Sequence, residues 1–186
     1  MTSLAPALLL SMPQLLDPNF VKTVVLLCRH SEEGAFGLVV NRPAVMSGRL
    51  TIGSAPGSSF EGELPVWVGG PVDPQRTWVL VAEAPGARAK EDAGVLRITD
   101  DLHLSASPDL LVAMFTPTPP ERARLVVGYS GWSPGQLEVE LQESSWLLSE
   151  VDARLIFETA PEDMWEAAIR RLGVDPGALH MGRGVH

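Results

Sequence analysis

Short apolar runs separated by polar turns dominate the first half of the chain. Residues 7–12 form a continuous apolar run that is typical of a buried strand, and residues 24–30 and 35–41 are rich in β-forming side chains. The four polar residues 31–34 separate the last two runs, and such a connection predicts a β-hairpin with Gly34 at a positive φ. Further strands are predicted at residues 66–68, 78–82 and 95–98.

Turn residues mark the segments between these strands. Asp17-Pro18 is typical of a short helical turn, and Pro43 is expected to end the strand at 35–41. Residues 44–64 and 83–94 show little periodicity, so both are predicted to be surface loops. The sequence Gly69-Gly70-Pro71-Val72-Asp73-Pro74 is a dense turn signal.

Helices alternate with strands in the second half. Ser107-Pro108 predicts a helix that runs to about residue 115, followed by strands at 125–129 and 155–157. Ser133-Pro134-Gly135-Gln136 has the pattern of a capping box and predicts a helix through Leu137, Leu141 and Ser145. A second capping box at 159–162 opens a helix that ends at Gly173, with one apolar face made of Met164, Trp165, Ala168, Ile169 and Leu172.

These elements predict an α+β (mixed α/β) fold, a single compact domain with a central mixed β-sheet and flanking helices. The domain is expected to span residues 1–186, with a core at about 4–174 and a mobile tail at 175–186. The length of 186 residues, with 45% hydrophobic and 20% charged side chains, is typical of one globular domain.

The net charge and the cysteine content disfavour several classes of function. The net charge of −9 and the scattered arginines disfavour nonspecific nucleic-acid binding. Cys28 is the only cysteine, which excludes an internal disulfide, and its apolar run predicts a buried thiol rather than a redox sensor. The apolar segment 4–12 is too short to span a bilayer and contains Pro6. The expected location is the cytoplasm, without a membrane contact.

One motif resembles a nucleophile elbow, because Gly131-Trp132-Ser133-Pro134-Gly135 matches G-x-S-x-G between a predicted strand and helix. The elbow needs the backbone N–H after the serine as an oxyanion donor, and Pro134 has none. The serine also serves as a helix cap, and only His180 and His186 follow it. No catalytic residue is therefore predicted.

Metal and nucleotide motifs are equally weak. Asp100, Asp101 and His103 match no established ligand spacing, and His30 with its neighbouring glutamates is explained by the hairpin turn. The chain contains no Walker pattern, and Gly69-Gly70 lacks the glycine spacing of a dinucleotide-binding loop. No metal and no cofactor are predicted.

Four ordered motifs resemble those of the YqgE/AlgH family. They are Pro13 to Phe20 with Asp17-Pro18-Asn19-Phe20, the segment Gly34 to Pro43, Gly69-Gly70-Pro71-Val72, and Gly128-Tyr129-Ser130-Gly131-Trp132-Ser133-Pro134-Gly135-Gln136-Leu137-Glu138-Val139-Glu140-Leu141 with Trp146-Leu147. The resemblance extends over about residues 4–174 and includes Trp165 to Gly173. It implies a compact mixed α/β fold with a central sheet, and it brings no catalytic residue. The name of one branch links that branch to transcriptional regulation of alginate production.

Strand ends and the glycine-rich motif define a candidate cleft for a small polar ligand or a peptide. Its residues are Asn41, Arg42, Gly69, Gly70, Gly128, Gly131, Trp132, Gln136 and Glu140. The alternative, which we prefer, is that the glycines allow close backbone approach while the other side chains pack and cap the corner.

Three functions follow, in this order. The first is a non-enzymatic regulatory or protein-interaction module, because catalytic motifs are missing and the chain is acidic and rich in tryptophan. The second is a small-ligand binder or weak enzyme that uses the cleft. The third is a transcriptional regulator, although no helix-turn-helix pattern or concentrated basic face supports DNA binding. The partner is expected to be a protein or a small molecule.

Overall fold

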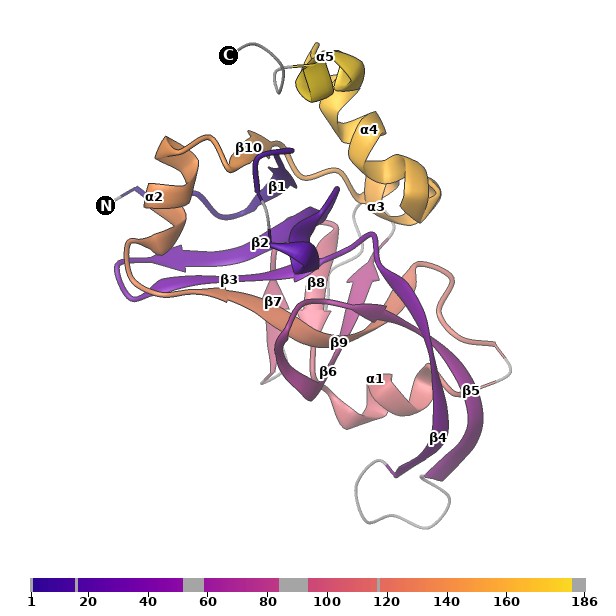
Figure 1. The fold of residues 1–186 in the computed structure, drawn as a ribbon. Helices are drawn as coiled ribbons and strands as arrows, with labels where there is room; N and C mark the ends of the chain where they lie inside the picture. Colours follow the sequence, from indigo (N-terminus) through magenta and orange to yellow (C-terminus); the bar gives the residue numbers. More distant parts are fainter. Residues whose placement is uncertain (1, 16, 52–58, 84–93, 117, 182–186) are drawn as a thin grey trace.

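The computed structural model contains a strongly curved ten-stranded β-sheet with helices at its sides and one end (Figure 1). The structure describes residues 2–15, 17–51, 59–83, 94–116 and 118–181. All strand pairs are antiparallel except β5–β9, which is parallel, so the predicted mixed sheet is confirmed. The predicted single α+β domain is confirmed as well.

One half of the sheet has the strand order β10-β1-β2-β3-β9. These strands are β1 (Ala7–Ser11), β2 (Val24–Ser31), β3 (Gly34–Val39), β9 (Ala123–Trp132) and β10 (Trp146–Ser149). The β2–β3 hairpin is confirmed, with Gly34 at φ +126°. β1 and β2 are apolar on both faces because they lie between two cores: Leu8 and Leu10 face one, and Leu9 faces the other.

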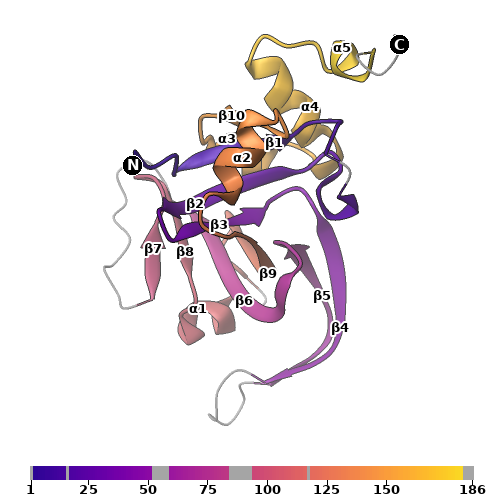
Figure 2. The same ribbon diagram turned by 60° about the vertical axis from the view of Figure 1, so that its left-hand side comes forward.

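The other half of the sheet has the order β4-β5-β9-β6-β8-β7, so β9 belongs to both halves. Its strands are β4 (Pro43–Thr51), β5 (Ser59–Val68), β6 (Val72–Ala82), β7 (Val95–Arg97) and β8 (Leu102–Ser105). The β4–β5 hairpin extends away from the body of the molecule in both views (Figures 1 and 2).

The helices are η1 (Pro18–Phe20), α1 (Pro108–Ala113), α2 (Gln136–Gln142), α3 (Ala153–Glu158), α4 (Pro161–Arg171) and α5 (Pro176–Met181). The apolar face predicted for α4 is confirmed for Met164, Trp165, Ala168 and Ile169, which are at most 1% exposed. Leu172, predicted on the same face, lies beyond the last helical residue Arg171 and is 39% exposed. Gly173 follows that helix at φ +75°, as expected of a glycine C-cap. Residues 176–181 of the predicted tail form α5.

Two element predictions were wrong. The described parts of residues 44–64 are not a loop, because Pro43 begins β4 and nine registered pairs join β4 to β5. Residues 155–157 lie in α3, where Leu155 and Ile156 pack into the core and Asp152 caps the first turn. A short apolar run fits a strand or a buried helix, and here the packing decided. The predicted loop at 83–94 falls largely on residues outside the described ones.

The turn and cap predictions also need correction. The turn after β5 is limited to residues 69–71, because β6 already begins at Val72. Gly135, in the left-handed region, precedes α2, and of the predicted capping box only the bond from the Ser133 N–H to Gln136 is present. Ala160 occupies the N-cap of α4, so Thr159 does not cap that helix. The α2 helix ends before Ser145, and the strands β8 and β10 were not predicted.

Candidate functional site

Three of the predicted glycines lie where the chain after β5 crosses β9. A Cβ atom on Gly69 would lie 2.6 Å from the carbonyl oxygen of Gly128, and one on Gly70 would lie 2.3 Å from the carbonyl of Tyr129. Gly128 has φ +70°, and its own Cβ would lie 2.6 Å from the Gly70 oxygen. The close backbone approach that these glycines predicted is therefore present.

Hydrogen bonds of Gly69 hold the segment after β5 against β3 and β9 at this crossing. The Gly69 carbonyl accepts from the backbone N–H of Val39 and from the buried Ser130 hydroxyl, while the Gly69 N–H donates to Val127. Gly131 differs from the other glycines, because a Cβ there would make only ordinary contacts of 3.5 Å or more.

Asn41 and Arg42 hold the segment between η1 and β2. The Asn41 amide accepts from the Val24 N–H and donates to the Lys22 carbonyl, both at 2.9 Å. The Arg42 guanidinium donates to the carbonyls of Pro18 and Val21 at 3.3 Å. Both side chains thus satisfy backbone groups of the segment that carries Phe20.

Trp132, Gln136 and Glu140 form a polar knot between β9, α2 and β10. One Glu140 oxygen accepts from the indole nitrogens of Trp132 at 2.8 Å and Trp146 at 2.7 Å. The other oxygen accepts from the Gln136 amide at 2.8 Å. Phe20 packs against both indoles, with ring centroids 6.4 and 5.4 Å away. The carboxylate therefore uses three donors of its own chain.

His30 lies on the other side of α2 and links it to the N-terminal segment. Its Nδ1 accepts from the Leu4 N–H at 3.1 Å, so the proton of the neutral ring lies on Nε2, which donates to Glu138 at 3.1 Å. The side chain of His30 is buried. The α2 helix is thus attached to the sheet on two sides, by Glu138 and by Glu140.

The predicted residues do not converge on one described cavity. Gly69, Gly70 and Gly128 meet at the strand crossing, Trp132, Gln136 and Glu140 meet at the knot, and Asn41 and Arg42 bind the η1 segment. Each set has a structural task. Binding of a ligand at these residues remains a prediction.

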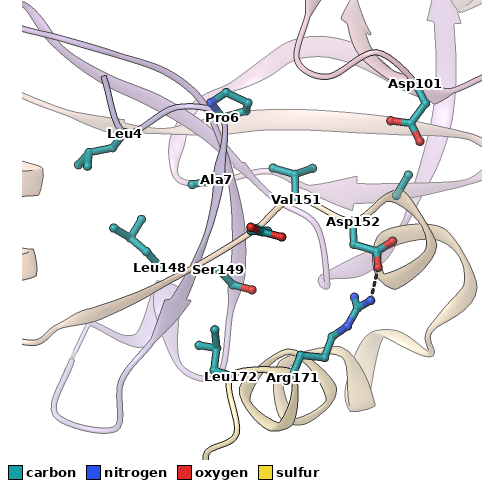
Figure 3. A pocket seen from close by; sticks show the side chains of 12 residues that line it. Leu4, Pro6, Ala7, Asp101, Leu148, Ser149, Val151, Asp152, Arg171 and Leu172 are labelled. Carbon is teal, nitrogen blue, oxygen red and sulfur yellow. Dashed lines mark hydrogen bonds and ion pairs between the residues drawn. The ribbon is translucent and has the colours of Figure 1, made fainter. Parts of the chain in front are cut away.

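The structure contains a groove that sequence reasoning missed, at the point where the chain leaves the sheet after β10 (Figure 3). It has a volume of about 780 Å³. Its walls come from residues far apart in the chain: Leu4, Pro6 and Ala7, Asp101, residues 148–153, and Arg171 with Leu172. No local pattern could have indicated it.

Three carboxylates and one guanidinium define the charge of this groove. Arg171 donates to Asp152, which also caps α3 through the N–H groups of Arg154 and Leu155 (Figure 3). Burial raises the pKa of Asp152, but these bonds outweigh it and hold that pKa below its ordinary value. Asp101 and Glu150 have no basic partner among the described residues, so the groove is acidic.

The only thiol of the chain is inside the protein. Cys28 is buried as predicted, and burial raises the pKa of its thiol. The described residues contain no group of three or more side chains placed to hold a metal ion. None of the described helices has the length and apolar composition needed to cross a membrane.

The chain belongs to the AlgH-like family, whose model matches residues 8–177. It is 43% identical over 188 residues to a UPF0301 protein of Myxococcus xanthus, and the alignment covers all of both chains. It is 38% identical to a UPF0301 protein of Magnetococcus marinus, covering 95% of this chain and 93% of that one. The resemblance to the YqgE/AlgH family is confirmed.

Solved structures support the same assignment. The solution structure of AlgH from Pseudomonas aeruginosa superposes with a TM-score of 0.69 at 34% identity, covering 100% of this chain and 96% of that one. A crystal structure from Corynebacterium diphtheriae gives a TM-score of 0.69 at 19% identity, covering 100% and 93%, and shows likeness of fold alone. These names state no biochemical activity.

Proposed function

We propose that this protein is a non-catalytic interaction module, and that the groove at the end of β10 docks an extended, basic segment of a partner protein. The observation that carries the proposal is the combination of an acidic groove with exposed apolar walls. Leu148 and Leu172 line it and are each 39% exposed. Apolar side chains left open beside polar ones are typical of interaction sites.

The charge of the groove selects a cationic partner. Asp152 is paired with Arg171, which leaves Asp101 and Glu150 for a ligand. The chain also carries a net charge of −9, so a basic segment is attracted over a distance while a second copy of the chain is repelled.

The edge of the sheet favours an extended peptide. β10 pairs only with β1 among the described strands, and Met12 donates to the Ser145 carbonyl. In an antiparallel ladder the backbone groups of alternate residues point outward, so those of Leu148 face the free edge. A partner strand can hydrogen-bond there while its side chains enter the groove.

The test is a titration of the full chain with a fluorescein-labelled hexapeptide of alternating lysine and valine, measured by fluorescence anisotropy at low ionic strength. Saturable binding is expected, and a peptide with glutamate in place of lysine should not bind. Glu150→Lys should weaken binding roughly tenfold, or about 1.4 kcal/mol. N-methylation of alternate peptide residues should abolish binding, because it removes the edge hydrogen bonds.

Glu143→Lys is the matched control. Glu143 is exposed after α2 and is not one of the groove residues, yet its substitution changes the net charge by the same amount. If both variants weaken binding equally, the attraction belongs to the whole acidic surface and the groove proposal fails.

A further inference from the structure

We propose that a second cleft, formed by β2, β3, β6, β7 and β9, binds a mononucleotide. The cleft has a volume of about 540 Å³, within the range of small-molecule sites. Arg29, Phe36, Arg76, Trp78 and Tyr129 supply its functional side chains, and residues 94–96 complete the lining. Its chemistry is opposite to that of the acidic groove.

Aromatic rings form the walls of the cleft. The Phe36 ring centroid lies 5.4 Å from that of Trp78 and 5.2 Å from that of Tyr129. All three rings are only partly buried, so flat surface remains accessible. Such rings bind a planar ligand by stacking, and they accept any nucleobase because every base has a π-face.

Two guanidinium groups make the cleft cationic in an otherwise acidic protein. Arg29 and Arg76 are exposed, and neither has an ion-pair partner among the described residues. The described lining residues include no carboxylate. The Arg76 guanidinium lies 4.5 Å from the Trp78 ring centroid, which orients it beside the stacking surface. Paired guanidinium groups fit the several oxygens of a phosphate.

Irregularities in the sheet place both arginines. The β2–β3 register shifts between Leu27 and Arg29, and the β6–β9 register shifts between Val72 and Thr77, a stretch that contains Arg76. A β-bulge turns a side chain away from the regular alternation and is frequent beside binding sites. Two separate register shifts thus bring the cationic groups to one cleft.

Net charge decides between a nucleotide and a nucleic-acid strand as the ligand. A single nucleotide fits better than a nucleic-acid strand, because the net charge of −9 repels a polyanion.

The experiment is isothermal titration calorimetry of the full chain with AMP, GMP, CMP and UMP, and with inorganic phosphate and adenosine as the separate halves of a nucleotide. At least one nucleotide should bind saturably, and phosphate and nucleoside should each bind at least roughly tenfold more weakly. Arg29→Gln and Arg76→Gln should each weaken nucleotide binding roughly tenfold.

Arg154→Gln is the charge-matched control, since Arg154 is exposed on α3 and does not line the cleft. Unchanged binding in this variant supports the site. The proposal is overturned if no nucleotide binds, if the variants of Arg29 and Arg76 bind as the parent chain does, or if phosphate alone binds as tightly as the nucleotides. If a single-stranded RNA oligomer binds more tightly than the mononucleotides do, the proposal of a mononucleotide site is overturned in favour of a site for a nucleic-acid strand.

Discussion

Glu140 is the residue on which the packing of α2 depends. Its carboxylate joins Gln136 on its own helix to Trp132 of β9 and Trp146 of β10. Hydrogen bonds to a charged acceptor are stronger than neutral ones, and a buried indole N–H left without an acceptor is costly. The motif Gly131 to Glu140 therefore has a structural role that requires no bound ligand.

Replacing Glu140 should destabilise the fold. Glu140→Ala leaves the two indole donors unpaired, so we expect a loss of about 3 kcal/mol in the free energy of unfolding, measured by urea titration. Glu140→Gln keeps an acceptor oxygen for the indoles and should cost less. Glu143→Ala, at an exposed site after α2, should change stability by no more than about 0.5 kcal/mol. Equal stability of the Glu140→Ala variant and the parent would refute this role.

His103 makes stability depend on pH. The residue is 8% exposed, and burial lowers the pKa of its imidazole below the ordinary value of 6.5. Glu83, 3.9 Å away, partly opposes the shift, and Arg97 adds to it. The unfolded chain consequently binds a proton at this site more readily than the folded protein does.

The contribution of His103 is therefore complete above pH 6.5 and is lost progressively as the pH falls below that value. Urea unfolding at about pH 7.5 and about pH 5.5 should show lower stability at the acidic pH. His103→Gln should reduce that difference, because the amide does not titrate. A variant whose pH dependence equals that of the parent would contradict the assignment.

At the scale of elements, the crossing of residues 69–70 over β9 holds the two halves of the sheet together. Gly128→Ala should be severely destabilising, because the methyl group would lie 2.6 Å from a backbone oxygen and φ is +70°. We expect a cost of about 3 kcal/mol in the free energy of unfolding.

Gly131→Ala provides the control on the same strand. The added methyl group meets nothing closer than 3.5 Å, so the cost should stay below about 1 kcal/mol. Thermal unfolding of both variants by circular dichroism gives the comparison. If the two substitutions cost the same, the close approach at Gly128 is not what restricts that position.

At the scale of the whole molecule, β9 couples the two halves. One end of this strand pairs with β3, and the rest pairs with β5 and β6. One core cluster also joins both halves, with Leu8 and Leu26 from the first, Leu80 and Leu104 from the second, and Trp165 from α4. Neither half can lose its structure without exposing apolar surface of the other.

This coupling predicts a single cooperative unfolding transition. In scanning calorimetry the calorimetric and van't Hoff enthalpies should agree, and far-ultraviolet circular dichroism and tryptophan fluorescence should give the same midpoint. Two resolved transitions, or midpoints that differ between the probes, would show that the halves unfold separately.

Local patterns in the sequence determined which segments form many of the helices and strands. The β2–β3 hairpin and α4 followed from periodicity and turn residues, because these report the backbone preferences of neighbouring residues. The close approach at Gly128 and the burial of Cys28 were also predicted, since glycine and apolar runs carry that information directly.

Only the tertiary structure decided which strands pair, and therefore where the acidic groove and the second cleft lie. Residues 155–157 became helical because α3 buries apolar side chains such as Leu155 and Ile156 in the core. The described parts of residues 44–64 became paired strands because each strand supplied the other's hydrogen bonds. Both cleft and groove collect side chains from distant segments, such as Arg29 with Arg76. Strand order depends on free energies summed over such distant contacts, and no window of neighbouring residues contains them.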